Sequence, residues 1–209
     1  MLADQSLREL LAAFASPAPT PAGGSASALA SAVGVSLLIM AASLARSRTG
    51  SIAEREALSS ARDALVPLQQ ELSAAVDLDH EAYRQLVSTR RVSTTSPLSN
   101  DEADEARQRA LRRATDVPLD VMRMSCRAMQ QALKVASHCH RPAASDVRVA
   151  ILLIRAGLAG ARSSALDNLA RIAHSEYADG AGAEIEQLSG DAAKAADDAE
   201  RSLSAPQYE

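Results

Sequence analysis

Two prolines and two glycines between Pro19 and Ser25 run directly into a stretch without charge, Ala26–Ala45. The prolines stiffen this loop, and the glycines leave its backbone open to a ligand because they carry no Cβ. The first N–H groups of a helix have no partner within the helix and carry partial positive charge. The junction therefore suits a carboxylate, a carbonyl oxygen or a phosphate. The simpler interpretation is a turn followed by a helix that Ser25 caps.

The uncharged stretch has the length of a membrane span, which is about 20 residues. It is rich in Ala and Ser, it lacks aromatic anchors, and its large apolar residues lie mostly within Val33–Met40. A signal peptide would begin earlier and follow a basic cluster, whereas this stretch follows Asp4 and Glu9. We therefore expect a central helix that other helices surround, and no membrane partner.

The composition favours helices. Of the 209 residues, 47% are hydrophobic, but only three are Tyr, one is Phe and none is Trp. Apolar residues rarely alternate with polar ones as they would in strands. A core of Leu, Val, Ile, Met and Ala lets helices approach closely. We predict an all-α fold, a single-domain helical bundle over residues 1–209, with frayed ends at 1–5 and about 200–209.

Charge and cysteine content exclude some partners and compartments. The formal net charge is −4 and the basic residues are scattered, so we expect no nucleic-acid partner. Cys126 and Cys139 provide no disulfide framework, which favours a cytoplasmic protein. His138 and His140 flank Cys139, but positions i and i+2 of a helix point to different sides. We therefore predict no metal site.

Apolar residues recur at helical spacing through most of the chain. Two of the long helices contain an interior proline, Pro67 or Pro118, which should kink them. The segment after Val76 either continues the third helix or starts a fourth. We expect an internal loop at Ser93–Asn100 and a helix cap at Ser145–Asp146. The predicted helices cover residues 7–14, 25–45, 51–76, 100–140, 147–172 and 178 onward.

Asp77 and Asp79 are the carboxylates best placed for chemistry, because they precede Tyr83 at an apparent helix start. On spacing alone, either is equally well explained as a helix N-cap. A serine or cysteine nucleophile is not indicated, because none lies in the glycine-framed turn of a hydrolase.

Five short segments of the sequence resemble the motifs of a known protein family. Pro19–Ala30, Asp79–Tyr83, Val117–Leu119, Ser145–Val147 and Asn168–Leu169 read PTPAGGSASALA, DHEAY, VPL, SDV and NL. In this order they resemble the PTPGGGS, D-x-x-A-F/Y, VPL, S-D and NL motifs of the cyclodeaminase/cyclohydrolase family. That family includes the cyclodeaminase domain of formiminotransferase-cyclodeaminase and stand-alone methenyltetrahydrofolate cyclohydrolases. The sequence departs from it at Ala22, Ala45, Ser47 and Ser164, and lacks a Leu-Pro-Lys after the aspartate helix.

The resemblance implies an all-α homodimer that binds a tetrahydrofolate derivative as its substrate and holds no tightly bound cofactor. It implies that Asp79 is the catalytic aspartate, beside a one-carbon bridge whose methenyl form is a cation. A carboxylate there offsets the positive charge and moves a proton. Arg48 would hold a glutamate carboxylate, and Asn168 the pterin. The implied substrate-binding residues are Pro21, Gly23, Gly24, Ser25, Arg48, Tyr83 and Asn168.

The reaction is then that of a methenyltetrahydrofolate cyclohydrolase, a C–N hydrolase, or of a formiminotetrahydrofolate cyclodeaminase, an ammonia-lyase. The departures favour an alternative, a divergent family member with a shifted substrate or no activity. A helical interaction module is a further alternative. Such a module would not need the Gly-rich junction and the aspartate in one cleft.

Overall fold

The computed structural model describes the backbone of residues 1–92 and 100–204, and the side chains of 1–89 and 102–204. The described residues form no strand, only an isolated bridge between Ser47 and Cys139, which confirms the all-α prediction. Two short 3₁₀ helices, η1 and η2, accompany the α-helices. The elements are η1 (Leu2–Asp4), α1 (Leu7–Phe14), α2 (Gly23–Ala42), α3 (Ile52–Val92), α4 (Asn100–His138), η2 (Arg141–Ala143), α5 (Ala144–Leu169) and α6 (Glu176–Ser204).

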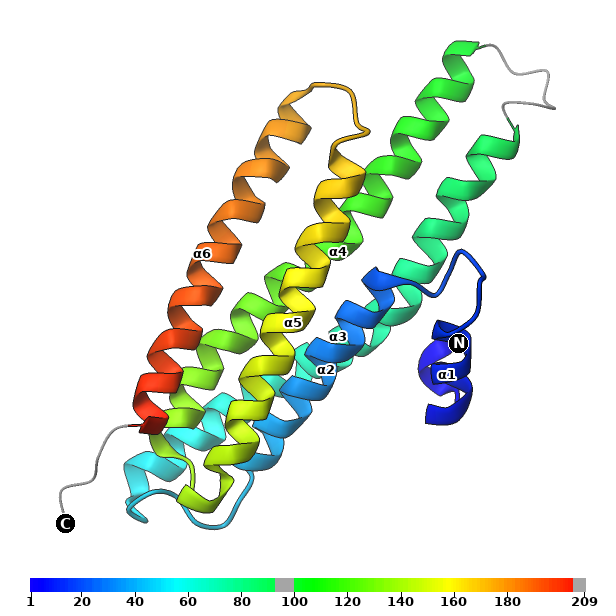
Figure 1. Cartoon of the computed structure of the whole chain (residues 1–209). Coiled ribbons are helices and arrows are strands. Elements are labelled where there is room, and N and C mark those ends of the chain that lie inside the picture. The colour runs from blue at the N-terminus through cyan, green and yellow to red at the C-terminus, as the bar shows by residue number, and fades with distance from the viewer. Residues whose placement is uncertain (93–99, 205–209) are drawn as a thin grey trace.

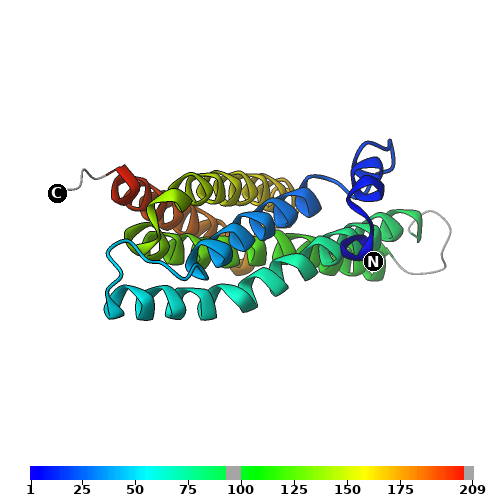
Figure 2. The same ribbon diagram turned by 90° about the horizontal axis from the view of Figure 1, so that it is seen from below.

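The helices form two layers (Figures 1 and 2). The first contains α2 and α5 side by side, and α3 and α4 lie behind them as a long hairpin. Helix α6 packs on α4 and α5. Figure 1 shows that the α3–α4 hairpin extends past the start of α2, with α1 alongside. The start of α2 therefore lies partway along α3 instead of at the end of the bundle.

The observed helix bounds test the predictions made for α3, α4 and α5. Helix α3 runs without interruption through Pro67 and on to Val92, so the segment after Val76 continues the third helix. The predicted cap of α5 is wrong, because that helix starts at Ala144 and Ser145–Asp146 lie in its first turn. Its N-cap is Ala143, which makes no side-chain cap hydrogen bond. The predicted loop falls on residues 93–99, outside the described part, and α4 begins at Asn100 as predicted.

Small residues let α2 and α5 pack closely. A Cβ on Gly157 would lie 2.1 Å from Ser31 Oγ, and one on Gly160 would lie 2.3 Å from Ser27 Oγ. Further along, Gly34 meets Ile154. The two helices are therefore antiparallel, and α2 begins beside the C-terminal part of α5.

Helix α2 is not surrounded on all sides, as we had expected. One side is exposed, with Val33 at 44%, Met40 at 38% and Leu44, just after the helix, at 40% of their accessible surface. The opposite side packs on α3, α4 and α5. By length and composition alone, α2 and the stretch Arg141–Leu169 would each be able to cross a membrane.

The N-terminal residues, which we expected to fray, are attached to α3. Leu2 is buried. Its backbone N–H donates to Asp77 Oδ1 at 2.5 Å, and the N–H of Ala3 donates to Asp77 Oδ2 at 3.3 Å. At the other end α6 continues to Ser204, and residues 205–209 lie outside the described part.

Candidate active site

The carboxylate of Asp79, from the C-terminal half of α3, lies against the first turn of α2. Ser25 Oγ donates a hydrogen bond to Asp79 Oδ2 at 2.9 Å. The N-cap of α2 is Ala22, which has no side chain able to cap. A carboxylate from another helix thus occupies the position where unpartnered N–H groups and the helix dipole favour negative charge.

This arrangement corrects two expectations about helix caps. Ser25 is not the N-cap of α2 but its third residue, and its fully buried hydroxyl serves Asp79. Asp77 and Asp79 do not precede a helix, because both lie inside α3. They point to different partners, Asp77 to the N-terminal segment and Asp79 to α2. Two residues along a helix separate side chains by about 200°, which explains the divergence.

The absence of a side chain at Gly24 makes room for Asp79. A Cβ built on Gly24 would lie 2.1 Å from Asp79 Oδ1 and 2.7 Å from Oδ2. The requirement is steric, since among the described residues only Gly50 has a positive φ. We expected this glycine to admit a ligand, but it admits the carboxylate. Gly23 has no atom within 4 Å of its Cβ position, so the backbone is open there.

The surroundings of Asp79 perturb its ionisation. Burial raises the pKa of its carboxyl above the ordinary value, and this effect outweighs the others. The hydrogen bonds from Ser25 and the charge of the adjacent His80 act in the opposite direction. A carboxyl whose pKa is raised toward neutrality takes up and releases a proton more effectively at physiological pH.

The loop before α2 closes one side of this region. Thr20 Oγ1 lies 2.9 Å from His80 Nδ1, and the Thr20–Pro21 peptide bond is cis. Between this loop and α3 lies a cleft of about 460 Å³. Tyr83 follows Asp79 by one helical turn, so the two residues share a side of α3. The cleft is lined by Pro19, Thr20, His80, Tyr83, Arg84, Val87 and Ser88.

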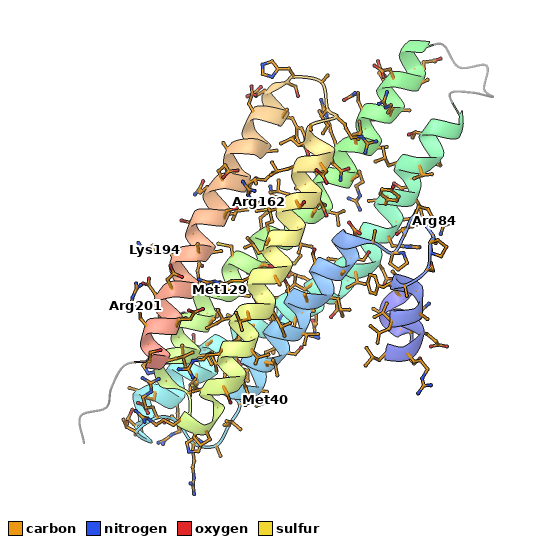
Figure 3. All side chains as sticks on the ribbon, viewed as in Figure 1. Met40, Arg84, Met129, Arg162, Lys194 and Arg201 are labelled. Carbon is orange, nitrogen blue, oxygen red and sulfur yellow. The ribbon has the colours of Figure 1, made fainter. Side chains whose placement is uncertain are left out.

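Figure 3 labels Arg84 on the part of α3 that lies beside this loop. Sequence reasoning missed Thr20, His80 and Arg84 as members of the site. For Thr20 and His80 a signal existed, because each lies within a motif segment. Thr20 is a specified residue of its motif and His80 is not, and neither motif pairs the two, so their contact emerged only from the fold.

Asn168 and Arg48 lie at opposite ends of α2. Asn168 is in the last turn of α5, the end near the start of α2, and its Nδ2 donates to the Ala114 carbonyl at 2.8 Å. Arg48 follows the other end of this 20-residue helix, which spans about 30 Å. Its guanidinium donates to the carbonyl of Ala136 on α4. The structure therefore does not bring Arg48 to Asp79 within one chain.

Comparisons with known proteins identify the family and the fold. The profile of the family described as formiminotransferase-cyclodeaminase matches residues 6–187, a range that includes the loop, Asp79 and Asn168. No curated protein matches the sequence. A crystal structure of formiminotetrahydrofolate cyclodeaminase from Thermotoga maritima has a similar fold, with a TM-score of 0.86 at 22% identity over 98% of both chains. The match of the profile to most of the sequence, site included, shows that the chain belongs to the formiminotransferase-cyclodeaminase family.

Proposed function

We propose that the protein is an enzyme of folate one-carbon chemistry that acts at the 5,10-methenyl bridge of tetrahydrofolate. It is either a methenyltetrahydrofolate cyclohydrolase or a formiminotetrahydrofolate cyclodeaminase. The observation that carries this proposal is the Asp79 carboxylate, held by Ser25 against the first turn of α2 with its pKa raised by burial. Family membership supports the substrate class.

The proposed chemistry uses both protonation states of Asp79. The methenyl form is an amidinium cation, and an ionised carboxylate beside its carbon offsets the positive charge. In the cyclohydrolase direction, water adds to that carbon and gives a proton to the carboxylate. The hydroxyl on that carbon then loses its proton to solvent and becomes a carbonyl as one C–N bond breaks. The released nitrogen takes up the proton held by the carboxyl, and the formyl group stays on the other nitrogen.

In the cyclodeaminase direction, N10 of the folate adds to the formimino carbon on N5, and the proton of N10 passes to the terminal nitrogen. The bond from that carbon to its terminal nitrogen then breaks. Protonated Asp79 supplies a proton to this nitrogen, which leaves as ammonia, and the methenyl bridge remains. Both directions require the same carboxyl group next to the same carbon.

The other predicted residues have separable roles in this proposal. The open backbone at Gly23 contacts the folate, while Gly24 and Ser25 position Asp79. Pro21 shapes the loop, and the ring of Tyr83 lines the adjoining cleft. Asn168 donates to Ala114, which leaves its carbonyl oxygen to accept from the pterin. Arg48 binds a glutamate carboxylate only if a second copy of the chain supplies it.

Two parallel assays test the proposal with purified protein. In the first, 5,10-methenyltetrahydrofolate is added and loss of its near-ultraviolet absorbance beyond the spontaneous rate indicates a cyclohydrolase. In the second, 5-formiminotetrahydrofolate is added, and a rise of that absorbance with release of ammonia indicates a cyclodeaminase. A rate equal to that of buffer alone in both assays would contradict the proposal and favour a divergent family member.

A further inference from the structure

The loop between α1 and α2 has few polar contacts to hold it. Pro17, Pro19 and Pro21 have no backbone N–H to donate. In the part of the chain that the structure describes, one hydrogen bond joins residues 15–21 to a helix other than α1 and α2. It is the bond between Thr20 Oγ1 and His80 Nδ1, at 2.9 Å. The attachment of this loop to α3 therefore depends on that bond and on packing.

His80, the residue after Asp79 in α3, lines two clefts. It lines the 460 Å³ cleft next to the loop and a second cleft of about 620 Å³ next to η1. The loop itself contributes no charged group to these surroundings. The clefts that His80 lines also include Asp77, Glu81, Tyr83, Arg84 and Met1, and Asp79 interacts electrostatically with His80.

We propose that His80 is a positioning residue of the active site, which holds the Pro19–Ala22 segment and the first turn of α2 beside Asp79 through its hydrogen bond to Thr20. The role of this contact in substrate binding rests on the function proposed above. The anchoring itself does not, because it involves only residues of the free protein.

The hydrogen bond tolerates both charge states of the imidazole. A hydroxyl donates to an unprotonated Nδ1 and accepts from a protonated one, so Thr20 remains bonded in either case. The charge of His80 nevertheless reaches Asp79, whose pKa it lowers against the larger effect of burial. His80 thus has two separable effects. Substitutions at Thr20 test whether His80 anchors the loop, and the pKa of Asp79 tests the effect of the His80 charge.

Two matched pairs of variants separate these effects. Thr20→Val removes the hydroxyl with little change of shape, and Thr20→Ser keeps it. His80→Ala removes the side chain, and His80→Asn keeps a hydrogen-bonding group near the position of Nδ1. Binding of 5-formyltetrahydrofolate, a stable folate, is measured by calorimetry. The titration of the Asp79 carboxyl is followed by ¹³C NMR, with Asp79→Asn to assign the signal.

We expect Thr20→Val and His80→Ala each to weaken folate binding about 2- to 12-fold, the usual loss for one neutral hydrogen bond. Thr20→Ser and His80→Asn should restore most of the affinity. The double variant Thr20→Val/His80→Ala should bind no more weakly than either single variant, because both remove the same contact. His80→Asn should raise the pKa of Asp79, whereas Thr20→Val should leave it close to that of the wild type.

Unchanged folate affinity in Thr20→Val would overturn the proposed anchoring, and an unchanged Asp79 titration in His80→Asn would overturn the charge effect of His80. If the wild-type protein does not bind the folate, the proposed function fails. The anchoring of the loop is then tested in the protein without ligand. In that case ¹⁵N NMR of His80 is compared between the wild type and Thr20→Val. A shifted Nδ1 resonance supports the contact, and an identical resonance refutes it.

Discussion

Asp77 and Asp79 show how one helix uses two neighbouring carboxylates for different purposes. Asp77 accepts from the backbone N–H groups of Leu2 and Ala3, whereas Asp79 accepts from the Ser25 hydroxyl. The first contact attaches the N-terminal segment to α3. The second places a proton-transfer group at the end of a different helix. Substitutions at the two positions should therefore have distinct consequences.

Asp77→Ala is expected to destabilise the fold without impairing turnover. It removes the acceptor for two N–H groups at the start of η1, and losing a helix cap costs about 1 kcal/mol. Urea unfolding measures the change in the free energy of unfolding, and the folate assays measure turnover. A variant of normal stability and reduced turnover would show that Asp77 belongs to the active site.

Asp79→Asn should stabilise the fold relative to the wild type at neutral pH, and less so at low pH. The folded state raises the pKa of Asp79 above the ordinary value of 3.8, so folded protein binds this proton more tightly than unfolded protein. Between the two pKa values the free energy of unfolding therefore falls as pH rises. Asn does not ionise and escapes this loss.

Thermal melting of the wild type and Asp79→Asn over a series of pH values tests this prediction. The advantage of the variant in Tm should shrink as pH falls toward 3.8. A wild type that gains stability over Asp79→Asn as pH rises would mean that hydrogen bonding, and not burial, dominates at this carboxyl.

At the scale of the element, the two glycines in the first turn of α2 have different surroundings and different expected roles. Gly24→Ala would place a Cβ 2.1 Å from Asp79 Oδ1, the end of a side chain that can rotate away. We expect a small change in Tm and a large loss of turnover, because the carboxylate leaves its position. Gly24→Val should have the same effect on turnover and should also weaken folate binding.

Gly23→Ala is the matched control, since its Cβ would enter open space. It should keep the Tm and the rate constant of the wild type and weaken folate binding, because the folate contacts the backbone there. Melting curves, kcat and calorimetric affinities distinguish the two substitutions. Equal turnover in Gly24→Ala and the wild type would show that the approach of Asp79 to α2 has no catalytic role.

Local periodicity predicted the helices because each depends on residues a few positions apart. Helix α1 and the course of α5 follow directly from apolar spacing, and the start of α4 from Asn100 followed by two acidic residues. The Asp79–Ser25 and Thr20–His80 contacts join residues 54 and 60 positions apart, so no local pattern contains them. The family motifs identified Asp79 and the loop as partners but left Thr20 and His80 unassigned. Arg48 illustrates the reverse limit, because the family resemblance assigned it to the substrate although α2 separates it from Asp79.

At the scale of the whole molecule, one apolar face has no covering helix among the described residues. In the first layer of Figure 1, α2 exposes Val33 and Met40, and α5 exposes Val149 and Leu152. The three arginines of α5 contact α6 instead: Arg155 and Arg162 form ion pairs with it, and Arg148 donates to the Leu203 carbonyl. Each of the two helices is about 30 Å or more long, and neighbouring helices lie about 8–10 Å apart.

We propose that a second copy of the chain covers this face through a two-fold axis. Two helices of that size present about 600 Å² per copy, or about 1,200 Å² in total, which reaches the range of stable interfaces. An axis across the middle of α2 would set the end of α2 in one copy beside its start in the other. In that arrangement the predicted role of Arg48 is retained.

Light scattering at micromolar concentration should therefore give the mass of a dimer. Leu152→Glu introduces a charge into the proposed interface and should yield monomers. Leu7→Glu changes a leucine that is 70% exposed on α1, away from this face, and should leave the dimer intact. A monomeric wild type, or dissociation by both substitutions alike, would contradict the proposed interface.

The central claim is that Asp79, at the start of α2, performs proton transfer on a folate one-carbon bridge. The most direct test compares turnover of the wild type and Asp79→Asn in the assay that detects activity, with 5-formyltetrahydrofolate affinity measured in parallel. The amide keeps an acceptor for Ser25 but can neither take up a proton nor offset a cation. We predict a loss of kcat of about 100- to 10,000-fold with affinity nearly unchanged. Normal turnover in Asp79→Asn would show that this carboxylate only caps α2.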